Sequence, residues 1–196
     1  MNQYLTTGPE ESIILTVSLI WALSEIVGAK IIPGLRGGRT VKARSDRASR
    51  MIIWLSVFVS IAVASVFGTN GITPLPDVFF YLGIVLVLAG IAFRQWAIWV
   101  LGRFFSTTVR ILTDHRMVTN GPYHFIRHPS YTGALMILTG LGLGSRTWGG
   151  TLVILVLFGL VYSYRISVEE SALKAEFGEE YISYAKKTKR LIPFLW

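Results

Sequence analysis

The chain is organised around one polar stretch, Gly121-Pro122-Tyr123-His124-Phe125-Ile126-Arg127-His128-Pro129-Ser130-Tyr131-Thr132-Gly133. This stretch holds two of the three histidines of the protein and lies between long apolar runs. Its two prolines and two glycines disfavour a regular helix, so the surrounding structure must hold its backbone. We therefore expect a functional site here, where the polar stretch meets the apolar segment that follows it.

The composition predicts an integral membrane protein. Hydrophobic residues make up 52% of the chain and charged residues 15%, and the mean hydropathy is +0.54. A length of 196 residues suits one compact helical bundle. The chain has no cysteine, which excludes disulfides, thiolate chemistry and cysteine metal sites. The first residues, 1–11, carry no Lys or Arg, so no cleavable signal peptide is predicted.

The net charge of +8 is better explained by a membrane than by nucleic acid, because the basic residues cluster beside the apolar runs. The stretch 33–50 is rich in Arg and Lys and is expected in the cytoplasm, whereas the loop 68–77 has neither and is expected outside. We therefore expect membrane lipids as partners, no nucleic acid, and a multi-pass protein whose active site faces the cytoplasm.

The predicted fold is an all-α polytopic membrane bundle of about five spans. The two regions expected are an N-terminal transmembrane region, 1–101, and a catalytic region, 102–196. After the last span, apolar residues three or four apart predict a C-terminal amphipathic cytoplasmic helix over 165–187, with Gly178 as a candidate break. The five expected spans are 12–32, 51–67, 78–101, 131–144 and 148–164.

Charged residues in or beside these spans have two readings each. Glu25 is expected to face neighbouring helices in a structural role, and a functional site is the alternative. Arg94 either extends its side chain to the interface or is a buried cation facing a polar pocket. Arg165 and Glu169 are four residues apart on one helix face, so they form either a surface ion pair or part of a site at the mouth of the bundle.

Three glycines, Gly140, Gly142 and Gly144, resemble a nucleotide-binding cluster only superficially. They lie inside an apolar helix without a preceding strand, so a face for close helix packing is expected instead of a phosphate site. No strand pattern is predicted anywhere in the chain. Any cofactor is therefore expected to be held by helices and loops.

The residues of the C-terminal half, from about Arg94 to Pro193, resemble the isoprenylcysteine carboxyl methyltransferase family. The combination of blocks is more specific than any one of them. The blocks are Leu101-Gly102-Arg103-Phe104-Phe105-Ser106, His115-Arg116-Met117-Val118, Gly121-Pro122-Tyr123, Arg127-His128-Pro129-Ser130-Tyr131-Thr132-Gly133, Arg165-x3-Glu169-Glu170 and Phe177-Gly178-Glu179-Glu180-Tyr181 with Tyr184.

The resemblance implies an integral membrane enzyme that uses S-adenosylmethionine to methylate the α-carboxylate of a prenylated cysteine or a similar lipophilic carboxylate. It implies catalytic roles for Arg165, Glu169 and Arg94, of which Arg94 falls near a third arginine of the family. Met117 stands where the family more often has leucine. The cofactor residues implied are His115, Met117, Val118, Gly121, Tyr123, His128, Pro129 and Tyr131.

The chemistry of the residues agrees with this. A carboxylate with a pKa near 3.5 is already ionised at neutral pH. Its methylation therefore requires that the site align it with the methyl donor and exclude water, and it requires no general base. Arg165 would dock the carboxylate and Glu169 would hold the guanidinium in place. Tyr123 and Tyr131 could offer aromatic faces to the adenine or the sulfonium.

Other functions remain open. A phospholipid N-methyltransferase would need a base and an anionic pocket, because amine methylation releases a proton. An NADPH-dependent sterol-type reductase can carry a similar Arg-His-Pro-x-Tyr block, and a membrane protein without catalysis is a further alternative. His124 and His128 are four apart like a helical metal pair, but Pro129 and the lack of nearby Cys or Asp argue against a metal, and none is expected.

Overall fold

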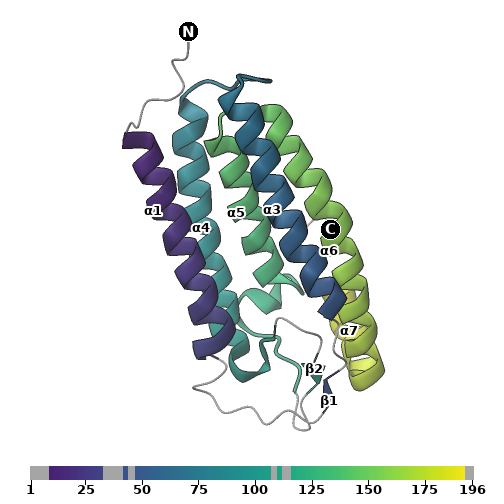
Figure 1. Ribbon diagram of the computed structural model, residues 1–196. Coiled ribbons are helices and arrows are strands. Elements are labelled where there is room, and N and C mark those ends of the chain that lie inside the picture. Colours follow the sequence, from purple (N-terminus) through teal and green to yellow (C-terminus); the bar gives the residue numbers. More distant parts are fainter. Residues whose placement is uncertain (1–8, 33–41, 44–46, 107–109, 112–115, 193–196) are drawn as a thin grey trace.

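The computed structural model describes residues 9–32, 42–43, 47–106, 110–111 and 116–192. Its long helices run side by side along one axis (Figure 1). The N-terminus lies at one end of the bundle, whereas the short strands and the last helix lie at the other.

Helices form almost all of the regular structure. The long helices are α1 (Pro9–Ile26), α3 (Arg47–Thr69), α4 (Val78–Leu101), α5 (Pro129–Gly144) and α6 (Trp148–Phe177), and the short α7 (Glu179–Lys187) follows. One π-helical turn, Val27–Ile31, extends α1, and short 3₁₀ turns cover Gly102–Phe104 and Gly121–His124. The prediction of a helical bundle is confirmed, with one small exception among the described residues.

That exception is a minimal antiparallel pair, β1 (Lys42–Ala43) with β2 (Arg110–Ile111). Only two residues pair on each strand, which is too short to give a periodic pattern in the sequence. The pairing joins two connections that are distant in the chain. It therefore places β1, which follows α1 in the chain, beside β2 at the end of the bundle where α4 ends (Figure 1).

The outer surface of the bundle is apolar. Leu15, Phe58 and Leu160 are each more than 60% exposed, although they lie in the middle of long helices. Three helices of the described part are long and apolar enough to cross a membrane: Met51–Thr69, Val78–Phe104 and Trp148–Phe177. Large apolar side chains that face outward along such helices are stable only against lipid, so the protein is an integral membrane protein.

The expected boundary between a last span and a separate surface helix is wrong, because α6 continues without a break from Trp148 to Phe177. No glycine or proline lies between Gly159 and Gly178 to end it. Gly178 does end the helix, as expected, with a φ of +54° that favours glycine. Arg165 and Glu169 therefore stand on one rigid helix that extends beyond the apolar part of the bundle.

Glycines allow α4 and α5 to pack closely. A Cβ atom at Gly83 would lie 2.5 Å from the carbonyl oxygen of Gly140 and from the backbone nitrogen of Gly144. A Cβ at Gly142 would instead meet α6, 2.9 Å from Cδ1 of Ile154. The prediction of a close packing face is confirmed, and it fixes α5 against both of its neighbours.

Candidate active site

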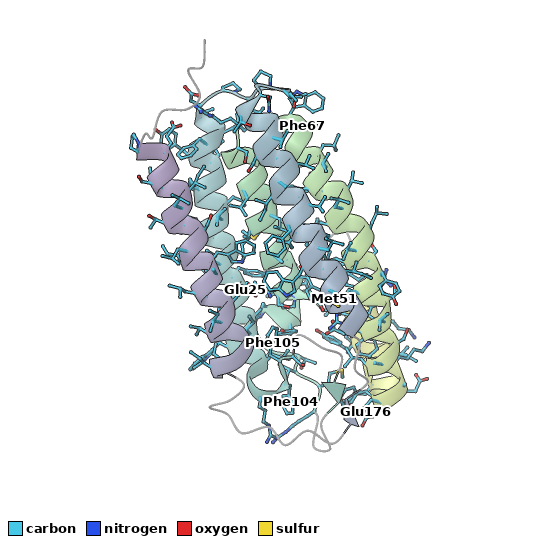
Figure 2. All side chains as sticks on the ribbon, viewed as in Figure 1. Glu25, Met51, Phe67, Phe104, Phe105 and Glu176 are labelled. Carbon is cyan, nitrogen blue, oxygen red and sulfur yellow. The ribbon has the colours of Figure 1, made fainter. Side chains whose placement is uncertain are left out.

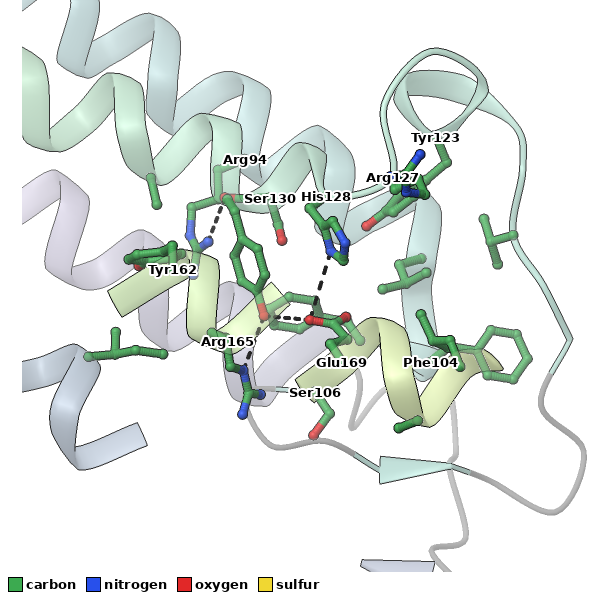
Figure 3. A pocket seen from close by; sticks show the side chains of 18 of the residues that line it. Arg94, Phe104, Ser106, Tyr123, Arg127, His128, Ser130, Tyr162, Arg165 and Glu169 are labelled. Atoms are coloured by element: carbon green, nitrogen blue, oxygen red, sulfur yellow. Dashed lines mark hydrogen bonds and ion pairs between the residues drawn. The ribbon is translucent and has the colours of Figure 1, made fainter. Parts of the chain in front are cut away.

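One cavity opens at the end of the bundle where α5 begins (Figure 3). Its wall takes residues from α1, α3, α4, α5, α6 and α7 and from the connection before α5, so segments distant in sequence meet there. The predicted residues in this wall are Arg94, Met117, Val118, Tyr123, His128, Tyr131, Arg165 and Glu169.

The Tyr131 hydroxyl links two of the predicted catalytic side chains, Arg165 and Glu169. It donates a hydrogen bond to Oε2 of Glu169 at 2.6 Å and accepts one from Nε of Arg165 at 3.3 Å (Figure 3). Arg165 is only 2% exposed, although its guanidinium group lines the cavity. The reading of Arg165 and Glu169 as a surface pair is therefore wrong. A buried charge needs partners, and one partner of Arg165, the Tyr131 hydroxyl, belongs to a residue that also lines the cavity.

His128 stacks on Tyr131, with ring centroids 5.5 Å apart and planes within 9° of parallel. Its Nδ1 lies 3.9 Å from Oε2 of Glu169, and its Nε2 lies 3.4 Å from Oε1 of Glu170. His128 precedes Pro129, the first residue of α5, whose fixed φ suits a helix start. The turn into α5 thus aims an imidazole and a phenol at the same carboxylate.

The C-terminal segment holds the backbone of the polar stretch. Arg127 N donates to the carbonyl of Lys189 at 2.7 Å, and His128 N donates to the carbonyl of Arg190 at 3.0 Å. The hydroxyl of Thr132 donates to the carbonyl of Leu191 at 2.6 Å. The expectation that surrounding structure holds this stretch is confirmed, and the support comes from about sixty residues further along the chain.

A second charged group behind the cavity was missed in the sequence. Glu170 binds Nε of Arg127 at 2.9 Å and Nη2 of Arg190 at 3.0 Å. Nη1 of Arg127 also donates to the carbonyls of Ala185 and Thr188. These contacts lock α6 and α7 onto the polar stretch. The sequence indicated this group only in part. Arg127 belongs to the polar stretch, but its partners are distant in the sequence.

Tyr123 enters the cavity wall from the 3₁₀ turn Gly121–His124, and its carbonyl accepts a hydrogen bond from the Tyr184 hydroxyl at 2.7 Å. Burial, with the charge of Glu169, raises the pKa of Tyr123. Burial also raises the pKa of Tyr184 to about 12. Both side chains are therefore neutral phenols at physiological pH, able to donate a hydrogen bond or to offer a flat face.

Two predicted cofactor residues that the structure describes do not line the cavity. Gly121 has a φ of +58°, and a Cβ there would lie 3.2 Å from Cγ2 of Val100, so its role is to shape the turn. Pro129 is buried behind the wall at the start of α5. His115 lies outside the described residues.

Arg94 is a buried cation at the cavity, and the interface reading is wrong. Its Nε lies 2.6 Å from Oε1 of Glu25, and the two side chains are 12% and 18% exposed. Glu25 faces a neighbouring helix, as expected, but it also lines the cavity, which was not expected. Figure 2 places Glu25 in the half of α1 nearer this end of the bundle, well away from Phe67 at the other end.

The cavity has an apolar arm that the sequence did not reveal. Trp21 of α1 and Ile53, Trp54 and Val57 of α3 line it, with Leu138 of α5. The first two spans carry no recognisable motif, so only the packing of α1 and α3 around α5 brings these residues to the site. The wall of the cavity therefore carries these apolar side chains as well as the charged residues.

Metal ligands do not cluster in the described part of the chain, where no group of three or more His, Asp or Glu side chains could hold an ion. The two histidines of the polar stretch also differ in environment. His124 is exposed, whereas His128 is 4% exposed.

Comparisons with known proteins relate the chain to a family of membrane methyltransferases. The model of the isoprenylcysteine carboxyl methyltransferase family matches residues 82–175. A probable protein-S-isoprenylcysteine O-methyltransferase of Oryza sativa subsp. indica is 33% identical over 117 residues, which cover 59% of this chain and 61% of the relative. The enzyme of that name from Schizosaccharomyces pombe is 40% identical over 86 residues, or 42% of this chain and 35% of the relative.

The chain thus spans less than two thirds of the length of these relatives. The cobalt-zinc-cadmium resistance protein CzcN of Cupriavidus metallidurans is 30% identical over 152 residues, which cover 74% of this chain and 64% of that protein. Among solved structures, a eukaryotic intramembrane Ras methyltransferase superposes with a TM-score of 0.73 at 23% identity, over 98% of this chain and 70% of that one. This last match shows that the helical membrane fold is shared.

Proposed function

We propose that the chain methylates a lipophilic carboxylate at the membrane, because residues 82–175 match the model of the isoprenylcysteine carboxyl methyltransferase family. The methyl donor in this proposal is S-adenosylmethionine, and the acceptor is the α-carboxylate of a prenylated cysteine or a similar lipid acid. The observation that carries it is the single cavity in which the buried cation Arg165 faces both the polar stretch and an apolar arm.

Arg165 supports a carboxylate acceptor. Its guanidinium group is buried at the end of the apolar bundle, where a charge-assisted contact with a carboxylate is stronger than in water. The Tyr131 hydroxyl, which contacts both Arg165 and Glu169, fixes the orientation of both groups. The acceptor is already ionised at neutral pH, so the site has to align it and exclude water.

The other half of the cavity fits the proposed cofactor. S-adenosylmethionine supplies an electrophilic methyl group on a sulfonium cation. The Glu169 carboxylate is about one third exposed at the cavity and can attract a cation, and Tyr123 and Tyr131 offer aromatic faces. The Tyr181 hydroxyl is buried without a hydrogen-bond partner in the described structure, so an acceptor atom of a ligand would satisfy it. We assign cofactor contacts to Met117 and Val118 on the same wall.

The apolar arm supports a lipid tail. Trp21, Trp54 and Val57 would contact an alkyl or prenyl chain that enters from the bilayer between α1 and α3, while the cofactor arrives from water. In this proposal residues 1–101 contribute most of the lipid arm and 102–196 most of the cofactor site. The bundle would cross the membrane five times, with α1 and the short α5 as the remaining spans, and with the cavity on the cytoplasmic side.

The alternative acceptor is the amine of a phospholipid. Transfer to an amine needs a base that accepts a proton, whereas a cation beside the acceptor opposes the approach of an ammonium group. Arg165 therefore favours the acid. A sterol-type reductase would bind NADPH and would release no methylated product.

A binding and transfer experiment tests the proposal. Protein purified in detergent is titrated by calorimetry with S-adenosylhomocysteine and with NADPH, and methyl transfer is measured to farnesylcysteine, phosphatidylethanolamine and a sterol. We expect binding of S-adenosylhomocysteine and methylation of farnesylcysteine. Binding of NADPH alone would refute the methyltransferase, and methylation of phosphatidylethanolamine alone would refute the carboxylate acceptor.

A further inference from the structure

The first helix places a carboxylate against the predicted catalytic arginine of α4. Nε of Arg94 donates to Oε1 of Glu25 at 2.6 Å, and Nη2 donates to Oε2 at 2.9 Å. Two parallel bonds between a guanidinium and a carboxylate define the orientation of both groups. The pair is largely buried, so it is screened little by water or salt.

The remaining nitrogen of Arg94 reaches the beginning of α5. Nη1 donates to the backbone carbonyl of Ser130 at 2.7 Å (Figure 3). Ser130 lies between His128 and Tyr131 in the sequence. The backbone of α5 also packs directly on this arginine, since a Cβ at Gly133 would lie 2.6 Å from Cβ of Arg94. Each of the three nitrogens of Arg94 therefore holds a protein group in place.

This geometry separates the roles of the two arginines at the cavity. The charge of Arg94 is compensated by Glu25 through two bonds, so a substrate carboxylate would have to compete with a fixed one. The helix α1 is held at the same level by a second contact, in which Nε2 of Gln95 donates to the carbonyl of Ser24 at 2.9 Å. The pair of Glu25 and Arg94 thus belongs to a rigid junction between α1, α4 and α5.

We propose that Glu25 is a positioning residue for the reaction and that it acts through Arg94. Glu25 orients the guanidinium group, which in turn fixes the Ser130 carbonyl and with it the turn that presents His128 and Tyr131. Arg94 is then also a positioning residue, and Arg165 alone docks the acceptor. This assignment rests on the proposed function, and it gives the N-terminal helix a part in catalysis.

Two conservative variants test the assignment. Glu25→Gln keeps the shape of the side chain but removes its charge. Arg94→Lys keeps a cation for Glu25 but offers a single nitrogen, which cannot bind Glu25 on two sides and reach Ser130 as well. Asp77→Asn is the matched control, because it weakens the ion pair of Asp77 with Arg146 at the opposite end of the bundle.

The first readout is hydrogen exchange of the amides at residues 129–134, which needs no activity. We expect both variants to exchange about tenfold faster there, with no change in the control. The second readout is turnover, for which kcat should fall about tenfold in both variants while the acceptor KM stays within about twofold. If the ion pair serves stability alone, Arg94→Lys should keep the kcat of the wild type, because lysine still offers Glu25 a cation.

Several outcomes would overturn the assignment. Unchanged exchange at 129–134 in both variants would show that the pair does not hold the turn. A higher acceptor KM with an unchanged kcat would show that Arg94 contacts the acceptor directly, and full activity of Arg94→Lys would reduce the pair to a stabilising contact. If the wild type neither binds S-adenosylhomocysteine nor methylates any acceptor, the proposed function fails, and the exchange data still decide whether Glu25 holds the turn.

Discussion

The two ends of the helical bundle use similar interactions for different purposes. At the end away from the cavity, Arg146 binds Asp77 at 2.8 Å and Glu10 at 3.5 Å, and Asp77 is 80% exposed. At the cavity end, Arg94 binds Glu25 and Arg165 contacts Tyr131, and these groups are largely buried. Charges in water can re-solvate when a partner is lost, whereas buried charges cannot.

The connections at the two ends differ in the same way. At the far end the hydroxyls of Thr73 and Thr147 lie 2.9 Å apart, and the amide of Leu75 donates to the carbonyl of Arg146, so the polar groups satisfy one another. At the cavity end the polar groups are arranged around a space, and the hydroxyl of Tyr181 has no partner in the described structure. Polar groups with a structural role are paired within the protein, whereas a binding site leaves some polar groups for its ligand.

The largest expected effect separates Arg165 of α6 from Arg146, which lies in the turn between α5 and α6. Arg165→Ala should lower turnover on a prenylcysteine analogue at least about 100-fold, equivalent to about 2.7 kcal/mol, because the acceptor loses its docking cation. Affinity for S-adenosylhomocysteine should change little. Arg146→Ala, at the far end, should leave turnover within about twofold. Parallel loss of cofactor affinity in Arg165→Ala would assign this residue to the cofactor or the fold.

The second effect concerns the far half of the bundle. Gly83→Leu would force a side chain against the backbone of α5, where a Cβ alone would be 2.5 Å from the carbonyl oxygen of Gly140. We expect a loss of about 1–3 kcal/mol of stability, seen as a lower Tm in detergent. Gly159→Leu is the matched control, because a Cβ at this glycine of α6 has nothing within 4 Å. A variant as stable as the wild type would mean that α4 and α5 do not pack closely.

A smaller effect is expected at the turn into α5. His128→Ala should weaken S-adenosylhomocysteine binding about tenfold, or about 1.4 kcal/mol, because the stacked ring that shapes the cofactor wall is removed. His124→Ala is the matched control from the same stretch, since this histidine is exposed. Calorimetry measures both. Equal losses in the two variants would point to a general disturbance of the loop and away from a contact with the cofactor.

The smallest effect tests the unpaired hydroxyl. Burial, with the charge of Glu170, raises the pKa of Tyr181, so this phenol keeps its proton and can donate. Tyr181→Phe should weaken S-adenosylhomocysteine binding by about threefold to tenfold, the range for one neutral hydrogen bond, without lowering the Tm. Tyr164→Phe changes an exposed hydroxyl and should have no effect. Unaltered affinity in Tyr181→Phe would show that the bound ligand leaves this hydroxyl unpaired.

The sequence by itself determined the class of the protein and the centre of its site. Its long apolar runs predicted membrane helices, because backbone polar groups in lipid must be satisfied within a helix. Its block from Arg127 to Gly133, with Arg165 and Glu169 downstream, predicted the residues that now share one cavity. These features are local in sequence or depend on one helix turn, so they can be read without coordinates.

The tertiary structure alone decided which distant residues meet. The pairing of Glu25 with Arg94, the lipid arm from α1 and α3, and the anchoring of the polar stretch by Lys189 and Arg190 all join segments far apart in the chain. The continuity of α6 through Arg165 is a further case, because the charge that begins there predicts a boundary but no residue there breaks the helix. Periodicity reports the face of a single helix, and partners across the bundle depend on how the helices pack.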